Sequence, residues 1–471
     1  MKQDKSTLPY VFRLTLIATL GGLLFGYDTA VVSGAVKAIQ EYFVVPLRQS
    51  FWIPKEAITG FAVSSALIGC IIGGSIAGFI SVAFGRKKGL VFAALLFIFS
   101  GIGAAFPEKM SLFGMEPLVS FIFYRSIGGI GIGLASMLSP MYIAEIAPAG
   151  IRGRLVSWNQ FAIVLGIFVV YFVNWFIAKQ GDEQWNITTG WRWMFLSSII
   201  PSLVFIILLL FIPETPRYLV LKNKHNKALE VLKRTVGEKE AEISMKEITE
   251  TLKTRSAPWL SFGGLIIIIS ILLAAFQQLT GINVVLYYAP KIFQNMGTRL
   301  DVSLLQTVLV GGVNVIFTVI AILTVDKLGR KPLLLIGGSI MGFAMAALGF
   351  TFYSENMGIL ALIFIMIYIA GFAMSWGPVM WVVLSEIFPN SIRGAMSIAT
   401  ATVWIADLVI TWSFPVLDDN IHLVEKFHHG FAYWIYAVIC LGAIVFVWRM
   451  IPETKGKTLE QIEKLWKKQS S

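Results

Sequence analysis

Twelve long apolar segments follow one another along this chain. Each approaches or exceeds the roughly 20 residues that an α-helix needs to cross a bilayer. With 56% hydrophobic and only 14% charged residues over 471 positions, the composition excludes a soluble globular protein. We therefore predict an all-α integral membrane protein with twelve transmembrane helices, at residues 10–36, 58–83, 89–107, 118–143, 155–178, 191–213, 258–293, 302–326, 333–354, 357–384, 395–415 and 429–451.

The basic residues indicate how the chain is oriented. An even number of spans places both termini on one side, and the termini, loops and adjoining span ends of that side hold 28 of the 38 Lys and Arg residues, against nine on the other side. Cytoplasmic loops of membrane proteins carry such an excess. We therefore expect cytoplasmic termini and a multi-pass protein of a bacterial inner membrane.

Several other classes of protein are excluded by single features. The net charge of +11 is explained by loops that face anionic lipid, so no nucleic-acid partner is expected. The first apolar segment is too long for a signal peptide and lacks a small-residue cleavage site. Cys70 and Cys440 lie inside predicted helices, and His422, His428 and His429 have no acidic or cysteine partners at ligand spacing. We expect no disulfide, metal, cofactor or enzyme activity.

Three short motifs occur twice, with 239 to 244 residues between the copies. In both halves they follow the second, fourth and sixth predicted helices. Such a repeat indicates a duplicated architecture. The pairs are 85–87 with 329–331, 144–153 with 385–394, and 213–215 with 452–454.

The duplication predicts two six-helix bundles that have the same orientation in the membrane. Parallel repeats with a substrate site between them at mid-membrane are typical of major facilitator transporters, which work by alternating access. We predict an N-terminal bundle at 1–213, a short cytoplasmic linker with helices at 214–257, a C-terminal bundle at 258–451 and a cytoplasmic tail at 452–471.

Charged residues of the repeated loops are candidates for a cytoplasmic gate. They can pair across the ends of the helices and close that side; the alternative is that they only anchor the loops to lipid headgroups. The second half has Asp-Lys at 326–327, whereas Val82 and Ala83 stand at the matching positions of the first, so the gate is predicted to be asymmetric. The candidates are Glu145, Arg152, Arg86, Glu386, Arg393 and Arg330.

The seventh segment has the side chains that a sugar site needs. Sugar recognition requires amide and hydroxyl groups to pair with hydroxyls, and an aromatic face for the ring. Gln277 and Gln278 are adjacent amides in an apolar run, Gly281 allows the helix to break beyond them, and Asn283 and Tyr287 share the next face. The seventh segment is therefore predicted to supply the polar lining of a sugar site.

Together these motifs resemble the sugar porter family of the major facilitator superfamily. The resemblance extends from Gly21 to about Trp466 and, in several longer stretches, is strongest to the bacterial members that couple D-xylose to protons. The stretches are 138–149, 281–290 and 373–390, and the family motifs are Tyr124–Gly131, Pro213–Arg217, Gln277–Asn283 and Pro452–Gly456.

The resemblance implies further sugar contacts on other helices. It points to the same residues of the seventh segment and adds Gln160, Asn314, Trp381 and Trp404, with Phe25 and Gly377 as further candidates. Gly377 and the following proline should bend the tenth helix and give it a hinge. The alternative is that the amides bridge helices and the tryptophans fill the core.

Asp28 lies deep in the first apolar segment, where an acid is a candidate functional group. Arg125 is a basic residue well inside a predicted span, away from its ends. We hypothesise that the two pair, and that a conformational change separates them and lets Asp28 take up a proton. The alternative is a static ion pair. Proton-coupled members of the family resemble this chain in having aspartate here, whereas facilitative relatives tend to have asparagine.

Four positions bear on which sugar is carried. Ile167 and Val403 stand where the resemblance leads us to expect glutamines, and Ser198 stands where some proton-coupled relatives have an acid. Asp407 stands where asparagine is common; it can bond a sugar hydroxyl, take part in proton movement, or face cavity water and do neither. The loss of two amides weakens the case for xylose and leaves glucose or galactose open.

The expected function is import of a monosaccharide with a proton by a monomer, D-xylose being the first candidate. The alternatives are symport of a hexose, facilitated diffusion without a proton, and a transporter-like sugar sensor. A sensor usually needs a long cytoplasmic tail, and here only residues 452–471 follow the last span.

Overall fold

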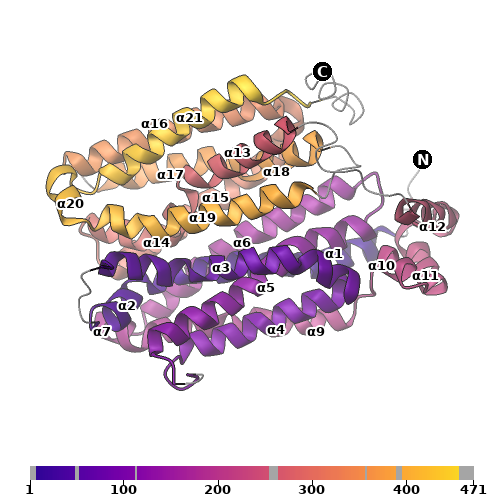
Figure 1. The fold of residues 1–471 in the computed structure, drawn as a ribbon, viewed down its shortest axis with the longest axis horizontal. Coiled ribbons are helices and arrows are strands. Elements are labelled where there is room, and N and C mark those ends of the chain that lie inside the picture. The colour runs from indigo at the N-terminus through magenta and orange to yellow at the C-terminus, as the bar shows by residue number, and fades with distance from the viewer. Residues whose placement is uncertain are drawn as a thin grey trace.

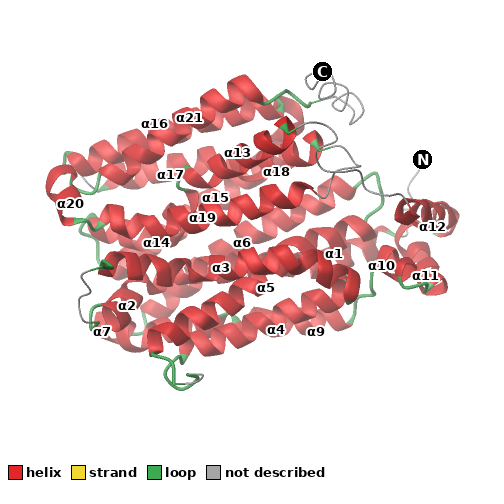
Figure 2. Cartoon of the chain, viewed as in Figure 1, coloured by secondary structure: helices red, strands yellow, loops and turns green. Residues whose placement is uncertain are grey.

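The computed structural model describes residues 7–47, 52–111, 114–253, 264–355, 358–388 and 395–455, and every regular element within these ranges is a helix (Figure 2). Twelve helical stretches are long and apolar enough to cross a membrane, which confirms the predicted number. The largest differences lie at span ends: the first stretch runs Leu8–Val44 rather than 10–36, and the sixth, Glu183–Leu210, begins before residue 191.

The first six spans form one half of the molecule, drawn from indigo to magenta in Figure 1. In the first span, α1 (Leu8–Ala30) continues through η1 (Val31–Ala35), α2 (Val36–Ile39) and η2 (Gln40–Val44). The sixth span likewise consists of several shorter helices. The remaining elements are α3 (Lys55–Ala83), α4 (Arg86–Ala105), α5 (Pro117–Ile146), α6 (Arg152–Ala178), α7 (Glu183–Trp185), η3 (Asn186–Gly190), α8 (Trp191–Ser197) and α9 (Ile199–Leu210).

The last six spans form the second half, coloured from rose through orange to yellow in Figure 1. Two of these spans are broken: α13 (Leu265–Leu279) is followed by α14 (Ile282–Asn295), and α17 (Ile359–Met374) by α18 (Trp376–Ile387). A short helix that was not predicted, α20, precedes the last span. The other elements are α15 (Leu300–Leu328), α16 (Arg330–Tyr353), α19 (Met396–Asp418), α20 (Ile421–Phe427) and α21 (Phe431–Met450).

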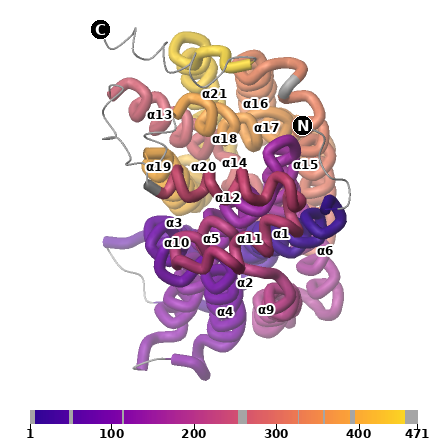
Figure 3. The backbone as a smooth tube through the Cα atoms, turned by 90° about the vertical axis from the view of Figure 1, so that its right-hand side faces the viewer, coloured from indigo at the N-terminus to yellow at the C-terminus, as the bar shows by residue number. Residues whose placement is uncertain are grey.

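Between the halves the chain forms three shorter helices at one end of the molecule, here called the linker end. They are α10 (Pro216–Leu221), α11 (His225–Val236) and α12 (Glu238–Lys253), and Figure 3 views the molecule from this end. Buried Ala228 and Val231 of α11 pack with Met245 and Ile248 of α12. These helices therefore have a small apolar core of their own.

The two halves meet where α3 packs on α19 and α6 on α15. Two hydrogen bonds cross between them toward the opposite end of the molecule, here called the far end. The Tyr171 hydroxyl donates to the backbone oxygen of Leu286 at 2.6 Å, and the Trp412 indole Nε1 donates to that of Ala57 at 2.9 Å. These bonds hold the halves together at the far end.

Candidate functional site

The break in the seventh span lies next to a chain of three amide side chains. Asn283 Nδ2 donates to Gln278 Oε1 at 2.9 Å, and Gln278 Nε2 donates to Gln277 Oε1 at 3.1 Å. Gln277 Nε2 in turn donates to the backbone oxygens of Trp376 at 3.2 Å and Gly377 at 3.4 Å. The chain of bonds fixes the orientation of each amide and ties α13 to the start of α18.

Gly281 makes this arrangement possible. Its φ of +94° lies in the left-handed region, and a Cβ there would come within 2.9 Å of the Tyr436 ring. Only glycine takes this conformation without steric cost. The break therefore turns the chain so that amides from both sides of it meet.

The tenth span is broken at Ser375, which confirms the predicted bend and places it just before Pro378. A proline has no backbone N–H, so the carbonyl of Met374 loses its donor four residues on. The span restarts at Trp376, whose carbonyl and that of Gly377 accept from Gln277. Half-buried Trp381 follows one turn after Gly377.

The other predicted sugar contacts lie on spans of both halves that meet at the interface. Asn314 is buried in α15, Gln160 is half-buried in α6, and Tyr287 is buried in α14. The Trp404 ring of α19 lies 5.5 Å, between centroids, from the Phe25 ring of α1. Trp404 Nε1 is buried without a hydrogen-bond partner, so a polar atom at the junction of the halves is left for a ligand.

The structure brings Asp28 and Arg125 together. Arg125 Nη1 lies 3.0 Å from Asp28 Oδ2, and Nη2 donates to the Asp28 backbone oxygen at 3.1 Å. Both side chains are at most 3% exposed, and the guanidinium lies over the Phe195 ring. Breaking such a buried pair by removing one partner costs about 3–5 kcal/mol. Ser198, three residues after Phe195 in the sequence, is also buried, and its hydroxyl donates to the Phe195 backbone oxygen.

The charged residues of the repeated loops pair within each half. Arg86 contacts Glu145 at 2.7 Å, and Arg330 contacts Glu386 at 2.8 Å. The bond that Arg152 makes is to the Ala147 backbone oxygen, at 3.4 Å, and not to Glu145. Arg393 lies outside the described residues. In this conformation the loop pairs join α4 to α5 and α16 to α18 rather than one half to the other.

The third repeated motif has a structural role that the sequence did not reveal. The Glu214 carboxylate accepts from the backbone N–H groups of Arg86 and Lys87 at the start of α4. Glu453 does the same for Arg330 and Lys331 at the start of α16. Carboxylates are favoured at helix N-termini. Both halves therefore use the same cap.

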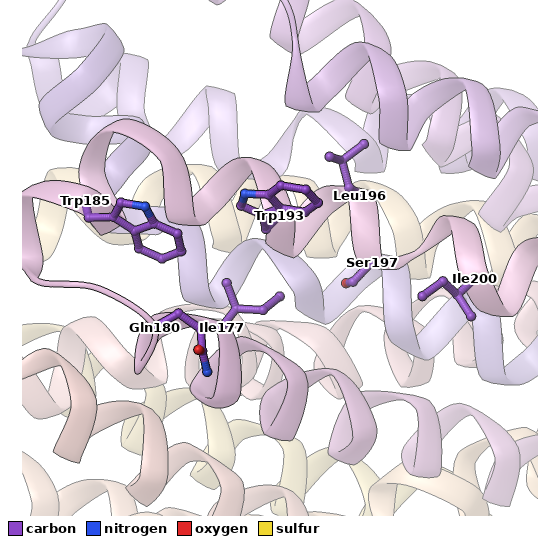
Figure 4. A pocket seen from close by; sticks show the side chains of 7 residues that line it. All are labelled: Ile177, Gln180, Trp185, Trp193, Leu196, Ser197 and Ile200. Atoms are coloured by element: carbon purple, nitrogen blue, oxygen red, sulfur yellow. The ribbon is translucent and has the colours of Figure 1, made fainter.

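A separate cavity of about 360 Å³ lies away from the amide chain, between the far end of α6 and α7–α9 (Figure 4). Its lining is almost wholly apolar, and Trp193 is 56% exposed. Exposed tryptophan is typical of the membrane interface. This cavity lacks the converging polar groups that a sugar needs. Its lining residues are Ile177, Gln180, Trp185, Trp193, Leu196, Ser197 and Ile200.

The far end carries a polar cluster that sequence reasoning missed. Asn295 Nδ2 donates to Asp418 Oδ2 at 2.9 Å, His429 Nδ1 lies 3.3 Å from Asp418 Oδ1, and Lys291 pairs with Asp419. These contacts tie α14 to the C-terminal end of α19 and to the loop before α21. The histidine does have acidic partners; they are 10 and 11 residues away in sequence, so spacing gave no signal. In the part of the chain that is described, no group of His, Cys, Asp and Glu is arranged to hold a metal.

The His429 contact predicts a stability that depends on pH. The hydrogen bond with Asp418 raises the pKa of His429 against the opposing effect of burial. A raised folded-state pKa stabilises the protein fully below the ordinary histidine pKa of about 6.5, and this gain is lost as pH rises through the folded-state value. We expect His429→Gln to lower the melting temperature in detergent at pH 6 and to have less effect at pH 9. Exposed His422→Gln is the control, and an equal loss at both pH values contradicts the prediction.

Among the described residues, twelve membrane-length helical stretches in two halves of six, with polar groups at the junction, define a secondary transporter of the major facilitator type. The profile of the family described as "Sugar (and other) transporter" matches residues 14–466. A D-xylose-proton symporter of Escherichia coli K12 is 51% identical over 97% of this chain and 96% of its own. A glucose facilitated diffusion protein of Zymomonas mobilis is 42% identical over 99% of both.

Solved structures agree with these relatives. The xylose transporter XylE from E. coli, in a partially occluded inward-open conformation, superimposes with a TM-score of 0.86 at 49% identity, over 96% of this chain and 100% of that one. XylE bound to 6-bromo-6-deoxy-D-glucose gives a TM-score of 0.82 at 50% identity, over 98% and 100%. The chain belongs to the sugar transporter family and is a transporter rather than an enzyme.

Proposed function

We propose that this protein imports a monosaccharide together with a proton by alternating access, with D-xylose as the first candidate. The observation that carries the proposal is the buried Asp28–Arg125 pair, in a chain that also has a row of bonded amides at the break of its seventh span. The pair supplies an acid that can hold a proton, and the amides supply sugar contacts. The similarity to a D-xylose-proton symporter supports the same combination.

The proposed cycle follows from the contacts between the halves. With the far end held by the Tyr171 and Trp412 bonds, the sugar exchanges with the linker end, which we propose to be cytoplasmic. Opening the far end breaks these bonds. Separation of Asp28 from Arg125 in that state lets the acid take a proton from outside, and sugar and proton then cross together.

The sugar contacts in this proposal are those predicted from the sequence. The charged residues of the repeated loops, which pair within each half in this conformation, would form the gate when the linker end closes. We propose that the protein transports sugar as a monomer in a bacterial inner membrane. Its two bundles comprise residues 1–213 and 258–451. The proposed sugar contacts are Gln160, Gln277, Gln278, Asn283, Tyr287, Asn314, Trp381 and Trp404, and the proposed gate residues are Glu145, Arg152, Arg86, Glu386, Arg393 and Arg330.

A hexose is the second candidate substrate. Ile167 and Val403 are apolar, buried side chains where the family resemblance leads us to expect amides. Fewer amides change which hydroxyls can be satisfied. A relative of similar length is a glucose facilitator, so a glucose carrier that works without a proton is the matching alternative mechanism.

The test is uptake into liposomes that contain the purified protein. Xylose and glucose uptake are measured with and without an inward proton gradient. We expect accumulation of one sugar above its external concentration only when the gradient is present. Equilibration that ignores the gradient contradicts proton coupling and favours facilitated diffusion, and no uptake of either sugar contradicts the choice of substrate.

A further inference from the structure

A cavity of about 210 Å³ lies at the far end, where the two halves meet; it is here called the junction cavity. One wall comes from η1, α2 and η2 at the end of the first span, and the other from α14 and the ends of α15 and α19. The two walls are in contact, since α14 packs against both η1 and α2. Exposed Glu41 is part of the lining, so the junction cavity is open to the surface.

The junction cavity is separate from the amide chain. Gln294, which lines it, follows Asn283 by eleven residues on α14, a distance of about 16 Å along a helix. Asp407, buried in α19 beside Asn283 and Tyr287, belongs with the amide chain and is not part of the lining. One monosaccharide cannot contact both places at once.

The lysines of the junction cavity already have acidic partners. Lys37 of the first-half wall pairs with Glu183, and Lys291 of the second-half wall pairs with Asp419. An anionic ligand such as a phosphate would have to compete with these carboxylates for the lysines. The charges of the lining therefore favour a neutral ligand.

Neutral polar groups in the lining have no partner. Ser33 is only 2% exposed, and its hydroxyl makes no hydrogen bond, although buried polar groups are normally bonded. Half-buried Gln40 and Gln294 lie on opposite walls, and their side chains make no hydrogen bond to the described residues. A hydroxyl and two amides can donate and accept together, which matches a molecule with several hydroxyl groups.

We propose that the junction cavity is a second sugar site, at which a monosaccharide binds between the two halves without contacting the amide chain. The inference rests on the proposed function and adds a site to it. The cavity has the volume of about seven water molecules, so it takes one small polyhydroxylated molecule and excludes a peptide.

A sugar in this site acts on the transport cycle because its walls belong to different halves. Opening of the far end moves the walls apart, so the sugar binds the closed far end better than the open one. A ligand that prefers one state shifts the population toward that state. Sugar at high concentration on the far-end side is therefore expected to slow its own uptake.

The experiment is protection of an introduced thiol in the full-length protein in liposomes. Cys70 and Cys440 are both buried, so Glu41→Cys places an accessible thiol on the lining and leaves Ser33 and both amides in place. We expect xylose or glucose to slow its reaction with a membrane-impermeant maleimide, by about elevenfold at ten times the dissociation constant, since only the empty site reacts. The control is Gln180→Cys, an exposed residue of the separate apolar cavity, whose labelling should ignore sugar.

Two further variants, each combined with Glu41→Cys, locate the bound sugar. Gln277→Ala alters the amide chain but not the junction cavity, so protection should persist. Ser33→Ala with Gln294→Ala removes a hydroxyl and an amide from the junction cavity. At about fivefold for each lost hydrogen bond, half-maximal protection should then need roughly 25 times more sugar. The same pair of substitutions should relieve the slowing of uptake at high sugar concentration.

The outcomes separate this inference from the proposed function. Protection that disappears with Gln277→Ala, or that is unchanged by Ser33→Ala with Gln294→Ala, assigns the effect to the amide chain and overturns the inference. Uptake of sugar without any protection of the thiol overturns the second site alone. Protection that is lost in the Ser33 and Gln294 variant, in a protein that transports neither sugar, supports the second site while the proposed function fails.

Discussion

Asp28→Asn is expected to abolish uphill sugar accumulation while sparing exchange of sugar across the membrane. Asparagine cannot take up a proton, so the gradient no longer drives the cycle. A gradient of one pH unit supplies about 1.4 kcal/mol, enough for roughly tenfold accumulation when one proton accompanies each sugar. We expect that ratio to fall to unity in the variant, measured in liposomes with labelled sugar.

The geometry favours asparagine over other replacements at this position. Arg125 Nη2 keeps its bond to the Asp28 backbone oxygen, and the amide oxygen can accept from Nη1, so the buried guanidinium retains partners. The control is Glu183→Gln, which changes an acid to an amide in an exposed ion pair with Lys37. This control should accumulate sugar normally. Accumulation preserved in Asp28→Asn would make the pair a static structural contact.

The architecture could be predicted because its signals are local or repeated. Each span can be recognised by its length and hydropathy. The copies of three motifs indicate the duplication without any knowledge of contacts. The motif residues then make matching contacts in the two halves: Arg86 with Glu145, and Arg330 with Glu386. A repeated sequence has folded into a repeated set of bonds.

Partner choice within the site could not be predicted, because it depends on how helices pack. Glu145 could bond Arg152 in its own loop or Arg86 from another helix, and the sequence cannot rank a near partner against a distant one. The structure selects Arg86, which begins α4 after Gly85, a residue with a φ of +95°. His429 and Asp418 meet for similar reasons across a loop. The charged residues could be identified from the sequence, but the packing of the helices determines which of them pair.

The break in the tenth span is another case in which the sequence predicts a local feature but not its contacts. Gly377 and Pro378 predict a bend, but nothing local indicates that the carbonyls at the start of α18 accept from Gln277 on another span. The carbonyl that Pro378 leaves without a donor is that of Met374, whereas Gln277 donates to the carbonyls of Trp376 and Gly377. The bend is therefore a local effect of the sequence, and the contact with Gln277 depends on how the two spans pack.

Gln277→Ala is expected to reduce sugar transport by more than about tenfold at low sugar concentration, because one substitution removes the end of the amide chain. Gln278 Nε2 loses its acceptor, and the carbonyls of Trp376 and Gly377 lose their donor. A buried polar group left without a partner costs about 1–3 kcal/mol. The measurement is initial uptake across a range of sugar concentrations, with Gln180→Ala as the matched control. Gln180 is exposed, its side chain donates to the Phe176 backbone oxygen near the end of α6, and it lines the separate apolar cavity, so its loss should leave transport intact.

The same variant separates sugar binding from helix bridging. If Gln277 contacts the sugar, KM rises and added sugar protects the wild type against heat more than it protects the variant, whether or not the melting temperature of the sugar-free protein falls. If Gln277 only joins α13 to α18, the melting temperature falls and KM stays near the wild-type value. Normal KM and normal stability together would remove Gln277 from the site, and with it the role proposed for the amide chain, since both neighbouring amides are oriented through it.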